Sequence, residues 1–478
     1  AQITGSDCQI VAEKAGTALQ GTAIYVGPTQ FAKTHLTDKS TFADEEWAMQ
    51  TSGDALILTG GRPRGTLYAV YHFLEDVCGV HWWTPWEETV PHTKVLSIPP
   101  LNKRGQPAFR YRDIHTLYAN DGGRFMARMR LDRQGDTPVD AAYGGSRNYG
   151  PPYHVHTFYL PAYIDPQKYF PAHPDWFIGN GKNVPTAANS QLAMSNPEMR
   201  KEFLKLLLQN IRDSRKEALE KNLPPPTVFD VSQNDARVGF ISGPEDEALV
   251  KANGGAEAAI LLSFINYLAD GIKEEFPDVF IDTLAYFNGE QAPTNMTARD
   301  NVIVRLADTQ SNVLLPITAE RNRAFRENVE NWSKVCQHLR IWDYAITYKF
   351  PHLPQPTMQT YPTDLRFLLQ HNVEGEFIEF EHPIDADMRD MKLWILCKLL
   401  EDPNQDYEAL VKEFTDGYYG AAGPFIRQYL TLLQDAAAKS NADVNWGFSG
   451  ARTDIDSFPY LTMNFLQKAD ALYTKAAA

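Results

Sequence analysis

The chain has 478 residues, of which 43% are hydrophobic and 22% charged, and its formal net charge is −15. This balance is typical of a globular protein of two or three domains and excludes a disordered or fibrous chain. The acidic charge disfavours nucleic acid and anionic membranes as partners, and no run of about 20 apolar residues predicts a membrane span.

Residues 1–102 predict a small α/β domain. Short apolar runs at 21–27 and 55–59 predict strands, and apolar residues at helical spacing predict a helix over 66–77. A segment dense in Pro and Trp follows, and residues 103–107 have the composition of a linker. The domain is therefore expected to end near residue 102.

Strand and helix patterns then alternate through residues 103–388. Candidate strands lie at 109–115, 154–159, 191–194, 227–232, 280–286, 301–307, 338–344 and 375–381, and amphipathic helices at 197–212, 256–275, 324–336 and 364–370. Eight strands with intervening helices predict a (β/α)8 TIM barrel. A doubly wound open sheet is the alternative, but no Gly-rich phosphate loop follows any strand. Residues 389–478 predict a helical C-terminal region.

Acidic residues fall where such a barrel carries its chemistry, at the carboxyl ends of the strands. These acids are Asp235, Glu290, Asp308, Asp343, Glu376, Glu379 and Glu381. Glycoside cleavage needs one acid to protonate the leaving oxygen and a second carboxylate as nucleophile or as base for water. Where the substrate carries an N-acetyl group, its own carbonyl oxygen can replace the enzyme nucleophile.

Asp235 and Glu290 are the first two catalytic candidates. Asp235 ends a compact polar run, Ser-Gln-Asn-Asp, after an apolar strand, and could be the general acid or the residue that polarises a substrate amide. Its structural alternative is a helix cap. Glu290 lies in a Gly- and Pro-containing loop beyond a strand end, where functional residues concentrate, although an exposed loop residue is the alternative.

Three further catalytic candidates are Asp343, Glu376 and Glu379. Alternation along a strand places Asp343 on the face opposite Trp342 and Tyr344, and we expect Asp343 to face the lumen of the barrel. Carboxylates on a central strand are too costly to bury without a partner. We therefore expect at least one acid of the last strand to reach the site.

Polar and aromatic residues near the strand ends are candidates for binding sugar. They are His154, His156, Arg112, Asp113, His115, Asn234, Tyr286, Asp308, Trp342 and Tyr344. The His-x-His pair could bind zinc, but no third ligand with suitable spacing follows, and the four cysteines also lack metal-site spacing. We expect no metal and no cofactor.

Several motifs carry a resemblance to known proteins. The run Gly65-Thr-Leu-Tyr-Ala-Val-Tyr-His-Phe-Leu-Glu75, with Gly79-Val-His-Trp-Trp83, resembles a module that precedes the barrels of hexosaminidases and α-glucuronidases. Downstream follow Phe170-Pro-Ala-His-Pro-Asp-Trp-Phe177, Ser195-Asn-Pro197, Val231-Ser-Gln-Asn-Asp235, Leu284-Ala-Tyr286, Ile341-Trp-Asp-Tyr344 and Val373-Glu-Gly-Glu376. Together they are similar to a bacterial domain family, long described as of unknown function, that includes the endo-β-N-acetylglucosaminidases of glycoside hydrolase family 163.

The resemblance implies a bacterial glycoside hydrolase that is secreted, periplasmic or at the cell surface and cleaves β-linked N-acetylglucosamine in complex N-glycans. Its partner would be an oligosaccharide or a glycoprotein glycan. One departure concerns residues 236–246, which contain no Cys where many relatives have a Cys-rich stretch. That difference leaves the exact glycan open.

Two other functions stay open. An α-glucuronidase-like or other exo-glycosidase would need an Arg to hold a uronate carboxylate, for which Arg305 and Arg340 are candidates. A glycan-binding surface protein without catalysis would need fewer acids at strand ends than this chain has. Oligomeric state and stereochemical outcome do not follow from the sequence.

Overall fold

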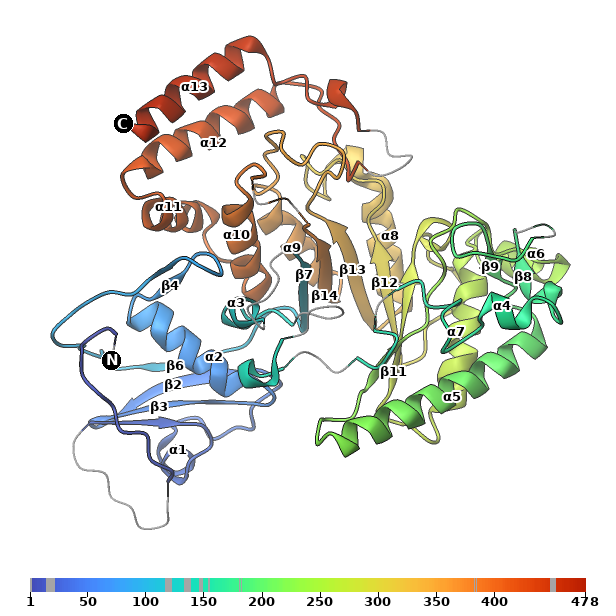
Figure 1. The fold of residues 1–478 in the computed structure, drawn as a ribbon, viewed down its shortest axis with the longest axis horizontal. Helices are drawn as coiled ribbons and strands as arrows, with labels where there is room; N and C mark the ends of the chain where they lie inside the picture. Colours follow the sequence, from blue (N-terminus) through green and yellow to red (C-terminus); the bar gives the residue numbers. More distant parts are fainter. Residues whose placement is uncertain are drawn as a thin grey trace.

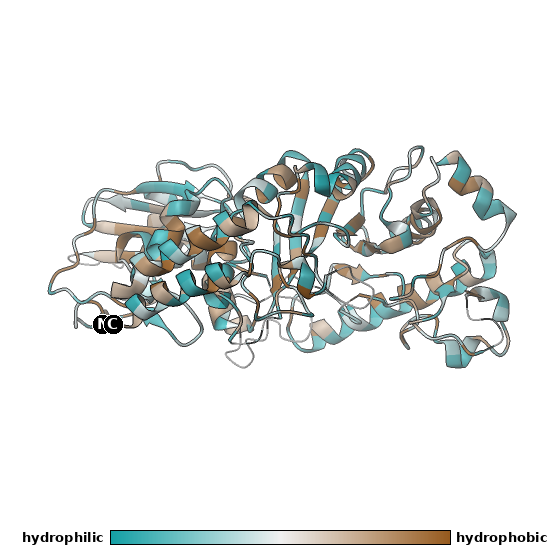
Figure 2. Cartoon of the chain, turned by 90° about the horizontal axis from the view of Figure 1, so that it is seen from above, coloured by the Kyte–Doolittle hydropathy of each residue, from teal (hydrophilic) through white to brown (hydrophobic). Residues whose placement is uncertain are grey.

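The computed structural model describes residues 2–13, 22–116, 123–132, 139–145, 149–153, 155–179, 181, 183–381, 383, 385–447 and 453–478. They form an N-terminal four-stranded sheet, a central six-stranded parallel sheet and a C-terminal group of helices (Figure 1). Figure 2 shows hydrophobic residues concentrated along the central strands, where helices cover the sheet. The domain boundaries given above stay a prediction.

The N-terminal sheet has the order β1-β3-β2-β6, with β1 parallel to β3 and the other pairs antiparallel. Its strands are β1 (Ala23–Val26), β2 (Trp47–Ser52), β3 (Ala55–Gly60) and β6 (Asn102–Gly105), and its helices are α1 (Gln30–His35) and α2 (Gly65–His72). A Cβ on Gly65 would lie 2.2 Å from the Glu46 carbonyl oxygen, so only Gly lets α2 begin this close to β2. A short hairpin of β4 (His81–Trp82) and β5 (Glu88–Thr89) follows α2.

The predicted linker is partly a strand. Residues 102–105 pair with β2 at the edge of the N-terminal sheet. The polar composition that suggested a linker is compatible with an edge strand, because its side chains reach solvent and neighbouring acids. Arg104, for example, binds Glu46 and Asp38.

The central sheet has six parallel strands in the order β10-β11-β12-β13-β14-β7, curled into a half-barrel. They are β7 (Tyr111–His115), β10 (Val228–Asp230), β11 (Phe280–Ala285), β12 (Val302–Ala307), β13 (His338–Tyr344) and β14 (Val373–Glu379). Six of the eight predicted strands are therefore found. The complete eight-stranded barrel is not confirmed.

The other two predicted strands lie elsewhere or do not form. Gln191 and Leu192 form β9, which pairs with β8 (Phe177–Ile178) in a separate antiparallel ribbon. The described residues of the segment 155–159 form no strand. There the Thr157 hydroxyl accepts a hydrogen bond from the Ser232 backbone N–H, which takes the place of a strand ladder.

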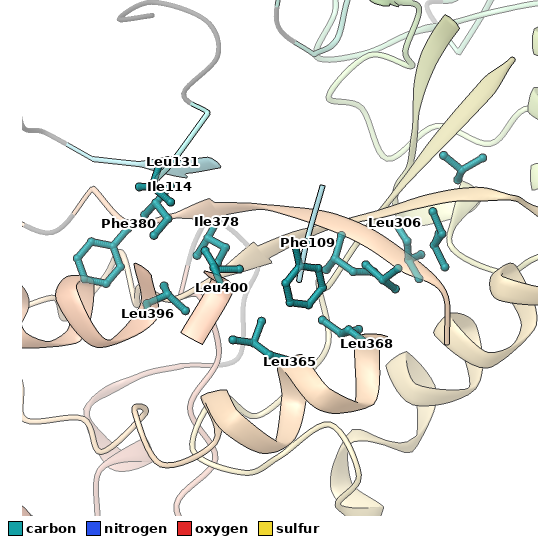
Figure 3. Packing of buried hydrophobic residues seen from close by; sticks show 14 of the residues in the cluster. Phe109, Ile114, Leu131, Leu306, Leu365, Leu368, Ile378, Phe380, Leu396 and Leu400 are labelled. Carbon is teal, nitrogen blue, oxygen red and sulfur yellow. The ribbon is translucent and has the colours of Figure 1, made fainter. Parts of the chain in front are cut away.

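Helices cover the convex face of the central sheet. They include α5 (Pro197–Glu220), α7 (Ala258–Ile272), α8 (Arg323–Val335), α9 (Tyr361–Gln370) and α10 (Arg389–Glu401), with the shorter α3 (Arg124–Arg128), α4 (Pro166–Tyr169) and α6 (Pro244–Ala252) in loops. Figure 3 shows Ile378 beside Leu400 of α10, Phe380 beside Leu396 of α10, and Phe109 between this group and Leu368 of α9. Each such buried side chain contributes roughly 1.5–3 kcal/mol.

Helix α5 shows how the sequence sets these elements. The Asn196 side chain accepts from the backbone N–H groups of Glu198 and Met199, and Pro197 occupies the first helical position. Apolar residues at helical spacing then bury one stripe of the helix; they are Met199, Phe203, Leu207 and Ile211.

The C-terminal region is helical, as the sequence predicts. After α10 come α11 (Tyr407–Tyr418), α12 (Gly423–Ala438) and α13 (Met463–Ala477). Between α12 and α13 the chain returns to the central sheet, where Val313 donates to the Val444 carbonyl and Tyr348 donates to the Trp446 carbonyl, both at 2.8 Å. None of the described helices is long and apolar enough to span a bilayer.

A buried arginine joins the N-terminal region to helix α10. Arg130 is 2% exposed; its guanidinium binds Glu75 of the N-terminal region at 2.6 Å and Glu401 of α10 at 2.7 Å. Removal of one partner from a buried ion pair leaves an uncompensated charge, which is strongly destabilising.

Replacement of Arg130 by Met should therefore lower the free energy of unfolding by about 3–5 kcal/mol, because Glu75 and Glu401 lose their guanidinium. Urea denaturation followed by circular dichroism measures this. Arg299→Met is the matched control, because Arg299 is a surface residue that pairs with Asp270. Equal midpoints for the two variants would contradict the prediction.

Candidate functional site

The concave face of the half-barrel carries the polar and aromatic side chains. On β13, Leu339 and Ile341 pack with the helices, whereas Trp342 and Tyr344 join a separate concave cluster that includes Tyr286, Phe377 and Trp446. Side chains alternate along a strand, so the carboxyl ends of these strands present one set to the concave face and the other to the helices.

The floor of the concave face carries buried ion pairs. Arg305 binds Asp230 and Asp282, each at 3.0 Å, and Arg340 binds Glu374 at 2.8 Å. Both guanidiniums are almost wholly buried. Because each already has carboxylate partners, neither supports the uronate-binding role considered for the α-glucuronidase alternative.

Asp235 lies beyond β10 with its side chain exposed to solvent. The Tyr286 hydroxyl donates to Asp235 Oδ1 at 3.2 Å, and the His156 ring lies 5.8 Å from the Tyr286 ring. Burial lowers the pKa of His156, and its Nδ1 lies 2.7 Å from the Gln233 carbonyl oxygen. The structure thus brings together three predicted site residues, Asp235, Tyr286 and His156.

Glu290 lies beyond β11 and is 6% exposed. The Thr309 hydroxyl donates to one of its oxygens, and the Gln310 amide donates to the other at 2.6 Å. Burial raises the pKa of Glu290, and nearby Asp308 adds to the rise. A carboxyl group with a raised pKa holds its proton closer to neutral pH, as a general acid requires.

Glu290 lines a groove of about 540 Å³, which is within the usual size range of ligand sites. The groove is lined by Arg237, Phe287, Asn288, Glu290, Thr309, Gln310, Ser311, Arg321, Asn322, Ala324, Phe325, Asn445 and Trp446. Trp446 stacks on Tyr344 with ring centroids 4.8 Å apart and donates to the Thr309 carbonyl at 3.2 Å. The segment between α12 and α13 therefore forms one wall of the groove.

A second acidic group sits at the ends of β14 and β7. Burial and the neighbouring Glu381 raise the pKa of Glu379 to about 9. The Tyr348 hydroxyl donates to Glu381 at 3.0 Å, and His115 Nε2 lies 3.5 Å from Glu381. The possible ligand atoms of His115, Glu379 and Glu381 lie within 4.8 Å of one another; among the described residues no other such trio could hold a metal ion.

Asp343 and Glu376 lie on the opposite, helix-covered side of the sheet. They line a small cavity of about 50 Å³ together with Asp308 and Asp364. Burial raises the pKa of Asp343 to about 7 and that of Asp364 to about 8, and within the described ranges no Lys, Arg or His lines this cavity. The expectation that Asp343 faces the lumen is wrong, because Trp342 and Tyr344 occupy that side.

The remaining candidates fall into three groups. Asp113 accepts from the Tyr111 hydroxyl at 3.1 Å on the concave face, where Trp342 also lies. Asn234 is buried and donates to the Ser190 carbonyl, and Arg112 is buried in the interface with the N-terminal sheet, so neither reaches the groove. His154 lies outside the described residues.

Four residues that sequence reasoning did not select contribute to the site: Arg237, Gln310, Tyr348 and Trp446. Arg237 and Gln310 each lie two residues after a selected acid, so an extension of those motifs would have found them. Trp446 follows a helical segment far along the chain, and no local pattern connects it to the strand ends.

A family profile described as a domain of unknown function (DUF4838) matches residues 82–431. No curated protein matches the chain. A family 89 glycoside hydrolase from Clostridium perfringens, in complex with its substrate GlcNAc-α-1,4-galactose, superposes with a TM-score of 0.51 at 10% identity, over 91% of this chain and 55% of that chain. The same family 89 enzyme in complex with PUGNAc gives a TM-score of 0.51 at 10% identity, over 90% and 54% of the two chains.

A GH138 enzyme targeting pectin rhamnogalacturonan II gives a TM-score of 0.39 at 8% identity, over 87% of this chain and 55% of that chain. These structural neighbours are glycoside hydrolases, and the family 89 superposition shows a shared fold. The present chain spans about half the length of the family 89 chain.

The buried carboxyl of Asp364 should make stability depend on pH. Its pKa rises from 3.8 to about 8 on folding, so its favourable contribution is complete below pH ~4 and is lost as pH rises towards 8. Between pH 4 and pH 8 the wild type should therefore lose free energy of unfolding that Asp364→Asn keeps. The variant should become more stable relative to the wild type as pH rises. Urea titrations at pH 4, 6 and 8 measure this change.

Asp270→Asn is the control for that series, because Asp270 is an exposed surface residue. It should follow the wild type at every pH. A constant difference between Asp364→Asn and the wild type across the three pH values would rule out the raised pKa.

Proposed function

The chain belongs to the DUF4838 family, and from this premise and the geometry of the groove we propose that it is a glycoside hydrolase. One observation carries the proposal. Asp235 and Glu290 lie beyond neighbouring strands, Tyr286 donates to Asp235, and burial, Asp235 and Glu290 all raise the pKa of Tyr286. Glycoside cleavage requires two carboxyl groups, and here Glu290 lines the groove while Asp235 is linked to it through Tyr286.

We assign the proton-donor role to Glu290. Burial raises its pKa, its two oxygens accept only from neutral donors, and it faces the groove in which a sugar chain would lie. In the first step its proton passes to the glycosidic oxygen as the bond from that oxygen to the anomeric carbon breaks. Positive charge then develops on the sugar ring.

Asp235 supplies the second carboxylate. Its hydrogen bond from Tyr286 fixes its orientation, and its exposure leaves it open to substrate or to water. With a substrate that carries an N-acetyl group, Asp235 would orient and polarise the acetamido group, whose carbonyl oxygen attacks the anomeric carbon. Water then completes hydrolysis.

The proposed substrate is a glycan that contains N-acetylglucosamine. The family 89 neighbour was solved with GlcNAc-α-1,4-galactose, and the sequence motifs resemble those of endo-β-N-acetylglucosaminidases. We therefore propose endo-cleavage of complex N-glycans, by a bacterial protein that is secreted, periplasmic or held at the cell surface.

Incubation of the purified protein with intact complex N-glycoproteins, with mass spectrometry of the products, tests the proposal. The expected product is a glycan one N-acetylglucosamine shorter than the full chain. Glu290→Gln should lower the rate by about 10²–10⁴-fold, the usual contribution of a general acid, and Asp235→Asn should lower it as well. Glu275→Gln and Asp270→Asn, at exposed ion pairs, are the matched controls.

Different outcomes test the proposed reaction and the proposed roles of individual residues. No release by the wild type would refute the N-glycan substrate, and glycan binding without any cleavage would favour the non-catalytic alternative. If Glu379→Gln abolishes release while Glu290→Gln retains it, the hydrolase stands and the proton donor is Glu379.

A further inference from the structure

The groove beside Glu290 has a cationic wall in a protein whose net charge is −15. The Arg237 guanidinium carbon lies 4.0 Å from the centre of the Phe287 ring, which in turn stacks on Tyr286 at 3.8 Å. A guanidinium held over an aromatic face loses little freedom when it binds a ligand. Arg237 is therefore pre-positioned near the proposed catalytic carboxyl groups.

Arg237 differs from the neighbouring arginines in its partners. Arg321, on the same groove, binds Asp443 at 2.9 Å, while Arg305 and Arg340 are neutralised on the floor of the half-barrel. Within the described part of the chain, Arg237 forms no ion pair. Its charge is thus available to a ligand.

The backbone of Phe287, whose ring contacts Arg237, has an uncommon conformation. Phe287 has a φ of +48°, in the left-handed region that residues other than Gly rarely adopt. Such a conformation persists only where the surroundings enforce it, and it is commonly found at ligand sites. Here it belongs to the residue whose ring supports the Arg237 guanidinium.

We infer that the groove binds a sugar that carries an anionic group, a carboxylate or a sulfate ester, and that Arg237 recognises this group. This inference rests on the proposed function, because it names the substrate class of the same site. The fork of donors on a guanidinium matches both anions. Among the described residues that line the groove, the one acid is Glu290, whose oxygens accept from Thr309 and Gln310.

Isothermal titration tests the inference with three biantennary glycans that end in a single reducing N-acetylglucosamine, so that the bond cleaved in the proposed reaction is absent. One glycan carries sialic acid, one carries sulfate on galactose, and one is neutral. The wild type should bind at least one anionic glycan roughly tenfold more tightly than the neutral one, the value of a charge-assisted hydrogen bond. This ratio should fall towards one in Arg237→Gln and shrink with added salt.

Arg237→Lys should retain part of the ratio, and Arg212→Gln, at an exposed ion pair, should retain all of it. Preference for sialic acid or for sulfate identifies the source of the anion. A wild-type ratio near one, or a ratio that survives in Arg237→Gln, overturns the inference, whether or not glycoproteins are cleaved. Conversely, an anion preference without any cleavage of glycoproteins would sustain this inference and refute the N-glycan substrate.

Discussion

Buried guanidinium groups fix how the N-terminal sheet meets the half-barrel. Arg64, Arg112 and Arg130 are each at most 2% exposed, and each binds at least one buried carboxylate. A buried charge without its partner is strongly unfavourable, so these elements cannot separate independently. Arg112 belongs to β7, whose opposite face carries Asp113 and borders the site. The interface thus positions one edge of the concave face.

The sequence allows the central sheet to be predicted because its signal is local. Six of the eight predicted strands form at nearly the expected residues, since runs such as 338–344 have the apolar pattern of a buried parallel strand. The segments 154–159 and 191–194 have a similar apolar character, but their pairing is decided by tertiary contacts. Thr157 bonds to Ser232, and Gln191 pairs with β8.

The site was predictable in part for the same reason. Asp235 and Glu290 follow strands and reach the same end of the sheet, as their positions suggest. Successive side chains of β13 point to opposite faces of the sheet, and Asp343 lies either on the face that packs against the helices or on the other one. Apolar side chains occur on both faces, so the sequence pattern alone does not decide which face meets the helices. Apolar Ile341 and Ile378 pack on the helix side, and Asp343 shares that side.

The segment between α12 and α13 has a consequence for how the protein is divided. The family match ends at residue 431, yet Asn445 and Trp446 line the groove and the Val444 carbonyl accepts from Val313. The region matched by the family profile thus contains Asp235 and Glu290 but lacks one wall of the groove that Glu290 lines. Relatives that share residues 82–431 can therefore differ in the shape of this groove through the later segment alone, with the carboxyl groups left unchanged.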